Sequence, residues 1–155
     1  MQVKCGTDLI RIERISQAIA RIGAPFLYRI WTAEELSDCL PADYTPGESL
    51  PGPAAASLAA RFAAKEAIAK ALGTGIGPMG VGWTNVSVRR TEHSAAPEVC
   101  LTGAALSRYK SLGGESISIS LTHDGPWAMA FCVLLQQSGG QDCIYEEKNR
   151  DEALR

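Results

Sequence analysis

The sequence predicts a mixed fold of helices and antiparallel strands, the α+β class. Segments 12–22 and 58–72 carry apolar residues at helical spacing. Segment 117–121 alternates apolar and polar residues, which is typical of a strand with one buried face. Asp124 and a glycine then form a turn, and the apolar stretch 127–135 returns as a strand that is apolar enough to be central.

The N-terminal elements can be placed from their boundary residues. Residues 2–8 are expected to form a strand with its apolar side chains on one face, and the helix over 12–22 ends at Gly23. Thr32, with Glu35 three residues later, is typical of a capping box. We therefore expect a further short helix directly after Thr32.

The middle of the chain combines a loop with the longest helical pattern. Segment 41–56 is rich in proline and has no periodicity, so we expect a surface loop there. Ser57 is expected to cap the helix over 58–72, and Gly73 to end it. The remaining expected elements are a glycine-rich loop over 73–82, strands over 83–90 and 98–101, and a short helix after Thr102.

Length and composition favour one domain over residues 1–137, followed by a polar, acidic tail over 138–155 that we expect to be disordered. No apolar run is long enough to span a membrane, and the N-terminus lacks a signal-peptide pattern. Five cysteines without a CxxC pair are typical of reduced thiols, so a cytoplasmic location is expected. A net charge of −2 gives no general attraction to nucleic acid.

The helix over 58–72 places charged side chains where apolar ones are expected. Arg61 and Lys65 fall inside its apolar arc, with Glu66 at the margin and Lys70 one turn further on. Buried cations are costly unless an anion meets them. Two interpretations remain open: the cations pair with carboxylates or extend to solvent, or they face a polyanionic ligand.

Three further features have both a structural and a functional interpretation. The loop GTGIG after the helix lets a ligand approach closely and offers the Thr74 hydroxyl, but it can equally be a helix C-cap and a turn. Asp8 ends the first predicted strand, where it caps the next helix or, with Glu66, holds a divalent cation. His123 ends another predicted strand, where a lone histidine is more often structural.

Three segments together resemble one family, the holo-acyl-carrier-protein synthases, which are 4'-phosphopantetheinyl transferases. They are GTDLIRIERI at 6–15, RFAAKEAIAKALGTGIG at 61–77 and SISLTHDGPWAMA at 118–130. Their order and spacing match the family, and the resemblance covers residues 1–137. It implies an α+β fold with a long central helix packed on an antiparallel sheet, and a homotrimer with active sites between subunits.

The resemblance also implies an activity, which is transfer of the phosphopantetheine arm of coenzyme A to a serine of apo acyl carrier protein, in fatty acid biosynthesis. Mg²⁺ is expected on Asp8 and Glu66, the serine is deprotonated by Glu66 or a metal-bound water, and Lys70 stabilises or protonates the leaving phosphate. The implied coenzyme-binding residues are Arg61, Lys65, Gly73, Thr74, Gly75 and His123. Arg14 and Arg21, otherwise a solvated helix face, are expected to bind an acidic helix of the carrier protein.

One departure from the family concerns the 3'-phosphate of the coenzyme. The family often places basic residues for it in the segment 41–60, which here contains no lysine or arginine. The contact is expected from Arg61 or from a neighbouring subunit, or else to be weak. The alternative functions are a non-catalytic trimeric module that binds a carrier protein or a nucleotide, and a different phosphate-handling enzyme.

Overall fold

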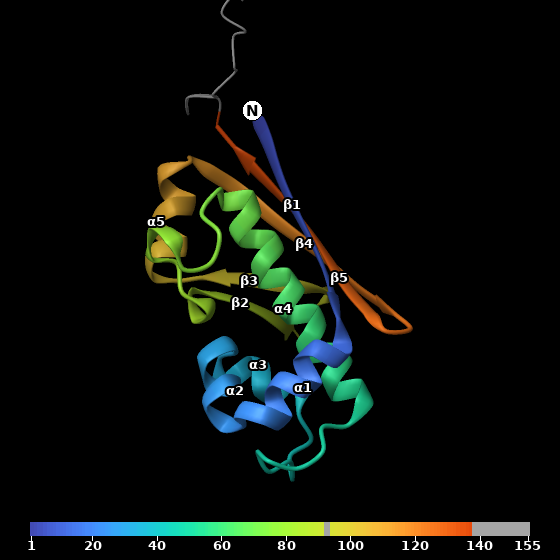
Figure 1. Ribbon diagram of the computed structural model, residues 1–155. Coiled ribbons are helices and arrows are strands. Elements are labelled where there is room, and N and C mark those ends of the chain that lie inside the picture. The colour runs from blue at the N-terminus through green and yellow to red at the C-terminus, as the bar shows by residue number, and fades with distance from the viewer. Residues whose placement is uncertain (92–93, 138–155) are drawn as a thin grey trace, which may run out of the picture.

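A long helix, α4 (Gly52–Leu72), lies across a three-stranded antiparallel sheet (Figure 1). The computed structural model describes residues 1–91 and 94–137, so the predicted tail over 138–155 lies outside the described residues. The strand order is β1 (Gln2–Arg11), β5 (Trp127–Gln136), β4 (Gly114–Asp124), with antiparallel pairing throughout. The α+β class and the central position of the 127–135 strand are thus confirmed.

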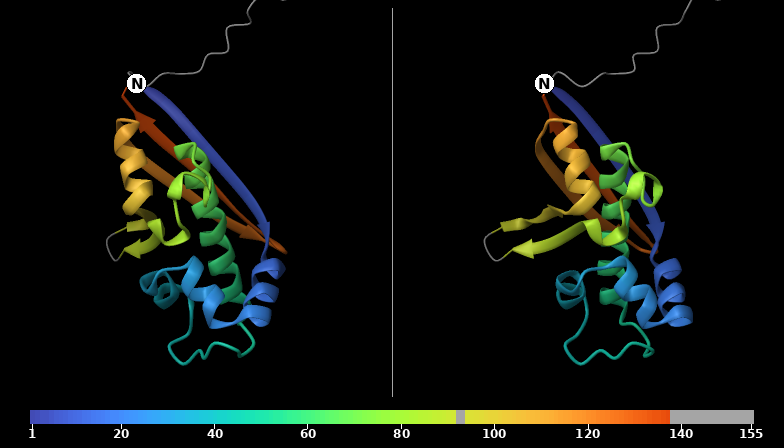
Figure 2. Two further views of the ribbon diagram at one scale, coloured as in Figure 1. Left: turned by 60° about the vertical axis from the view of Figure 1, so that its left-hand side comes forward. Right: turned by 90° about the vertical axis from the view of Figure 1, so that its left-hand side faces the viewer.

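The two faces of this sheet differ sharply in their burial. Ile10, Ala128 and Ala130 belong to the face that packs against α4 and are almost fully buried. Val3 and Cys5 share a face, as predicted, but it is the opposite one and both side chains are exposed. Figure 2 shows that none of the helices in the described part of the chain covers this outer face.

The other elements surround the two ends of α4. A two-stranded antiparallel sheet projects beside the helix, and three short helices gather near its N-terminal end (Figures 1 and 2). These elements are α1 (Ile12–Ile22), α2 (Ala24–Ile30), α3 (Ala33–Cys39), β2 (Val86–Thr91), β3 (Ser94–Leu101) and α5 (Gly103–Ser111). The predicted capping box of α3 is present, because Thr32 accepts from the Glu35 amide and Glu35 accepts from the Thr32 amide.

One predicted boundary is wrong, and one helix was not predicted. The loop predicted over 41–56 ends at Pro51, and α4 begins at Gly52, because Pro53 fits the first turn of a helix and the alanines after it are buried. The apolar stretch after Gly23 is the helix α2, with Pro25 in its first turn. The predicted end of the first helix at Gly23 is confirmed. Both Pro25 and Pro53 lie in the first turn of a helix, where the missing N–H of proline is tolerated.

Helix α4 is buried on nearly all sides, because a run of small alanines lets neighbouring backbones approach closely. Among the helices described, none has the length and apolar character that a membrane crossing requires.

Candidate functional site

Asp8 and Lys70 meet where β1 crosses α4. The Lys70 ammonium donates to Asp8 Oδ1 at 2.8 Å and to the Thr7 carbonyl oxygen at 2.8 Å. Asp8 was expected at a strand end, but β1 continues to Arg11, which is itself the N-cap residue of α1. The helix-capping alternative for Asp8 is therefore wrong, and its carboxylate faces α4 from within the strand.

A glycine makes this close crossing possible. A Cβ atom placed on Gly6 would lie 2.0 Å from the Ala67 carbonyl oxygen, a distance at which no side chain fits. Because Gly6 and Asp8 point to the same face of β1, the close approach at Gly6 brings Asp8 against α4.

Glu66 belongs to the same cluster. Partial burial and the nearby Asp8 carboxylate raise the pKa of Glu66, while Lys70 opposes the shift. Glu66 and Lys70 are one turn apart on α4, so they share a face of the helix. The structure thus brings together Asp8, Glu66 and Lys70, the three residues that were expected to be catalytic. This carboxylate cluster contains one cation and two acids.

The donor set of this cluster fits Mg²⁺ and not a closed structural metal site. Asp8 and Glu66 offer hard carboxylate oxygens, and their mutual repulsion favours a divalent cation between them. Within the described residues, no group of three or more histidine, cysteine or acidic side chains is placed to hold a metal. Mg²⁺ commonly completes so small a protein donor set with water and phosphate oxygens.

Lys65 corrects one prediction for this helix. Its ammonium is fully buried and donates to Glu35 Oε2 at 2.7 Å, to the Trp83 carbonyl oxygen at 3.0 Å and to the Val86 carbonyl oxygen. Burial lowers the pKa of Lys65, and Glu35 opposes that shift. Lys65 therefore pairs with a carboxylate in the core, which is the first of the two interpretations of the sequence. Its ammonium is not directed at a coenzyme site.

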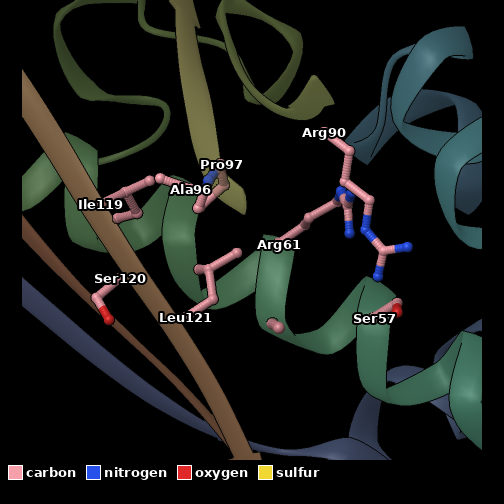
Figure 3. A pocket seen from close by; sticks show the side chains of 9 residues that line it. Ser57, Arg61, Arg90, Ala96, Pro97, Ile119, Ser120 and Leu121 are labelled. Carbon is pink, nitrogen blue, oxygen red and sulfur yellow. The ribbon is translucent and has the colours of Figure 1, made fainter. Parts of the chain in front are cut away.

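Arg61 is also paired, but it reaches a pocket. Its Nη2 donates to Asp38 Oδ2 at 3.3 Å and its Nε donates to the Val88 carbonyl oxygen at 3.0 Å. The pocket beside it has a volume of about 420 Å³ and lies between α4, the β2–β3 hairpin and β4. Figure 3 shows Arg61 and Arg90 close together near Ser57, with Ile119 and Leu121 across the pocket.

The pocket and the carboxylate cluster occupy opposite sides of α4. Helical residues turn by about 100° each, so Ser57 in the pocket and Glu66 in the cluster are separated by roughly 180° around the axis. The pocket also borders β4 and the cluster includes β1, which are the two edge strands of the sheet. Within one chain, the two parts therefore face away from each other.

The glycine loop after α4 forms a helix C-cap, which was one of the two interpretations of its sequence. Gly73 ends the helix with a φ of 72°, and the buried Thr74 hydroxyl donates to the Ala69 carbonyl oxygen at 3.3 Å. Arg108 also binds this helix end, since its Nε donates to the Leu72 carbonyl oxygen at 3.1 Å. Thr74 thus belongs to a C-cap, and its hydroxyl is not directed at a ligand, which corrects that prediction.

Among the residues that the structure describes, no side-chain hydrogen bond or ion pair joins the carboxylate cluster to Gly75, His123, Arg14 or Arg21. The exposed His123 is on the same sheet face as Asp8, but the strand β5 lies between their strands. Arg14 and Arg21 are exposed two turns apart on α1, so they share one face of that helix. Gly75 follows the C-cap of α4 with a φ of 63°.

Two acids that contact predicted site residues, Glu35 and Asp38, were not assigned these contacts from the sequence. Glu35 accepts from Lys65 and from the Val88 amide at 3.0 Å, beyond its capping role. Asp38 accepts from Arg61 and from the Arg90 amide at 3.1 Å. The sequence indicated these contacts only weakly, through two acids in one predicted helix and two adjacent arginines in one predicted strand.

Comparisons with known proteins match the chain over almost its whole described length. The family model of the 4'-phosphopantetheinyl transferase superfamily matches residues 4–132. The chain is 39% identical over 138 residues to a holo-[acyl-carrier-protein] synthase of Dinoroseobacter shibae, covering 86% of this chain and 91% of the relative. It is 41% identical over 133 residues to that of Herpetosiphon aurantiacus, covering 83% and 94%.

Solved structures agree with the sequence relatives. The holo-[acyl-carrier-protein] synthase of Neisseria meningitidis superimposes with a TM-score of 0.70 at 34% identity, covering 86% of this chain and 98% of that one. The enzyme of Helicobacter pylori, solved in complex with coenzyme A, gives a TM-score of 0.68 at 27% identity, covering 84% and 99%.

Proposed function

Because the chain belongs to the 4'-phosphopantetheinyl transferase superfamily, we propose that it is a holo-acyl-carrier-protein synthase. It transfers the 4'-phosphopantetheine group of coenzyme A to a serine of apo acyl carrier protein and releases adenosine 3',5'-bisphosphate. The observation that carries this proposal is the cluster of Asp8, Glu66 and Lys70 where β1 crosses α4. The complex of a relative with coenzyme A supports the donor.

Asp8 and Glu66 are proposed to hold Mg²⁺ together with the pyrophosphate oxygens of the coenzyme. The ion would neutralise charge on those oxygens and position the phosphorus that is attacked. Glu66, or a water molecule beside it, is proposed to take the proton of the carrier serine as the serine oxygen approaches phosphorus.

Lys70 supplies the cation of the reaction. Its ammonium lies 2.8 Å from Asp8 and is about half exposed, so it can contact a phosphate that binds to the carboxylate cluster. As the serine oxygen bonds to phosphorus, the bond to the adenosine bisphosphate breaks and negative charge grows on the leaving phosphate. A fixed ammonium stabilises that charge more in the transition state than before it.

A homotrimer with active sites between subunits is part of the proposal. The uncovered outer face of the three-stranded sheet carries large apolar side chains, an arrangement that favours contact with another protein surface. They are Val3 (65% exposed), Leu9 (57%), Trp127 (38%), Met129 (38%) and Phe131 (44%). In a ring of copies, the β1 edge of one subunit can face the β4 edge of the next.

Such a ring would complete the site. The carboxylate cluster and the arginine pocket face away from each other in one chain, whereas neighbouring copies can join them around one coenzyme molecule. His123, on β4, would then belong to the pocket side of the joint site. Gly73 and Gly75, which both have a positive φ, are proposed to line the path of the coenzyme.

The acceptor is proposed to dock on α1. Arg14 and Arg21 present two guanidinium groups from one exposed helix face, which suits an acidic helix of the carrier protein. Among the described cysteines, all four thiols are free, which supports a reducing compartment such as the cytoplasm.

The decisive experiment incubates the protein with coenzyme A, Mg²⁺ and an apo acyl carrier protein, and then records the intact mass of the carrier. We expect the carrier to gain one phosphopantetheine group, and the gain to disappear when its acceptor serine is replaced by alanine. Binding of carrier or nucleotide without a mass gain would favour the non-catalytic module and contradict the proposed activity.

A further inference from the structure

The pocket beside Arg61 contains a second arginine, Arg90, to which the family resemblance gives no role. Arg90, near the end of β2, lines the same pocket as Arg61 and Ser57, and its side chain lies beside that of Arg61 (Figure 3). Arg90 is exposed, while Arg61 is only 4% exposed. The pocket therefore has one arginine fixed in its wall and another at its solvent side.

Charge in this pocket is only partly balanced. Asp38 accepts from the Arg61 guanidinium at 3.3 Å, but from Arg90 it accepts only the backbone amide, at 3.1 Å. Among the residues that the structure describes, the Arg90 guanidinium takes part in no ion pair. Two guanidinium groups against one carboxylate leave the pocket with an excess positive charge, which suits a phosphate group.

The shape of the pocket agrees with a nucleotide phosphate. Arg61 and Arg90, with Ser57 beside them, form the cationic side of the pocket. The opposite side is apolar and consists of Pro97, Ile119 and Leu121. An apolar wall beside a phosphate-binding arginine pair suits a ligand that carries a flat ring next to a phosphate monoester.

We infer that Arg90, together with Arg61, binds the 3'-phosphate of coenzyme A and makes the enzyme select the 3'-phosphorylated donor. This inference rests on the proposed function. It also accounts for the missing basic residues, because segment 41–60 contains no lysine or arginine while Arg90 approaches the pocket from another element. The required cation is supplied from β2 instead of from the loop before α4.

The test uses two nucleotides that differ only by the 3'-phosphate, adenosine 3',5'-bisphosphate and adenosine 5'-monophosphate. Titration calorimetry is expected to show tighter binding of the bisphosphate by the wild-type protein. Arg90→Ala should weaken bisphosphate binding by about tenfold, the size of a lost charge-assisted hydrogen bond, and leave monophosphate binding unchanged. Arg89→Ala is the matched control, because Arg89 is the adjacent exposed arginine and does not line this pocket.

Transfer kinetics provide the second measurement. Arg90→Ala should raise KM for coenzyme A, keep kcat, and leave kcat/KM for 3'-dephospho-coenzyme A unchanged. Equal losses with both nucleotides, or none with the bisphosphate, would overturn the role of Arg90. Absence of transfer by the wild-type protein would instead contradict the proposed activity, since the nucleotide titrations decide the role of Arg90 without any turnover.

Discussion

The Lys70 ammonium lies 2.8 Å from Asp8 Oδ1 and 2.8 Å from the Thr7 carbonyl oxygen, so one side chain of α4 binds both the backbone and the carboxylate of β1. The contact holds a cation next to the two acids of the candidate site. It also means that Lys70 has a structural and a chemical role, which substitutions can separate.

Replacing Lys70 with methionine keeps the length of the side chain and removes its charge. We expect kcat for phosphopantetheine transfer to fall by about 100-fold, the loss typical for one group that stabilises transition-state charge. Affinity for Mn²⁺, used as a probe of the metal site, should not fall, because the two carboxylates stay in place. Lys110→Met, at an exposed lysine of α5, is the control, and a wild-type kcat in Lys70→Met would contradict the role of Lys70.

Much of the fold followed from local sequence signals. The alternation over 117–121 and the turn at Asp124 predicted the β4–β5 hairpin, and the capping box predicted the start of α3. These signals act over a few residues, so the sequence contains them in full. Helix α2 was missed because Gly23 and Pro25 read equally as a break or as the boundary between two helices.

The candidate site shows a different limit. The sequence identified Asp8, Glu66 and Lys70 through the family resemblance, and the structure brings them together. It could not separate Lys65 from Lys70, although only one of them is exposed, because burial of a cation depends on a carboxylate from a distant element. That partner is Glu35, whose capping role gave no indication of a second contact.

The buried pair of Lys65 and Glu35 leads to a prediction about stability. Lys65→Met leaves the Glu35 carboxylate buried without its cation, so we expect about 3–5 kcal/mol of stability to be lost in urea denaturation. Adding Glu35→Gln should restore part of the loss, because the uncompensated charge is removed. Lost coenzyme affinity at unchanged stability in Lys65→Met would show that Lys65 is a ligand-binding residue after all.

The contact of Gly6 with α4 predicts that even a methyl group there is harmful. In Gly6→Ala the Cβ atom would lie 2.0 Å from the Ala67 carbonyl oxygen, so β1 must move away from the helix. We expect a loss of about 1–3 kcal/mol in thermal or urea unfolding, together with reduced transfer. Gly52→Ala, where the added atom meets nothing within 4 Å, should change little, and a Gly6→Ala protein as stable and active as wild type would contradict the close crossing.

The proposed trimer depends on the outer sheet face. Phe131→Lys places a charge in the middle of that apolar face, where Phe131 is 44% exposed. We expect sedimentation equilibrium to show a shift from trimer to monomer, and transfer to be lost because the two parts of the site then lie on separate molecules. Tyr28→Lys, at an exposed aromatic residue of α2, should leave the assembly intact. A fully active Phe131→Lys monomer would exclude an interfacial site.

Substitution of the two acids is expected to leave the fold intact, which makes them suitable probes. Burial and Asp8 raise the pKa of Glu66, so the ionised carboxylate is disfavoured in the folded protein at pH values above its ordinary pKa. Glu66→Gln removes that unfavourable charge, and its melting temperature without metal should be equal to or above that of the wild type at pH 7. A large drop would reveal a structural role instead.

The most direct measurement is the binding of Mn²⁺ in the presence of coenzyme A, followed by electron paramagnetic resonance in the wild type, Asp8→Asn, Glu66→Gln and the double variant. If β1 and α4 each contribute one carboxylate to a shared ion, either single substitution should remove most of the bound signal, and the double variant should lose little more. Wild-type Mn²⁺ affinity in either folded single variant would contradict that site.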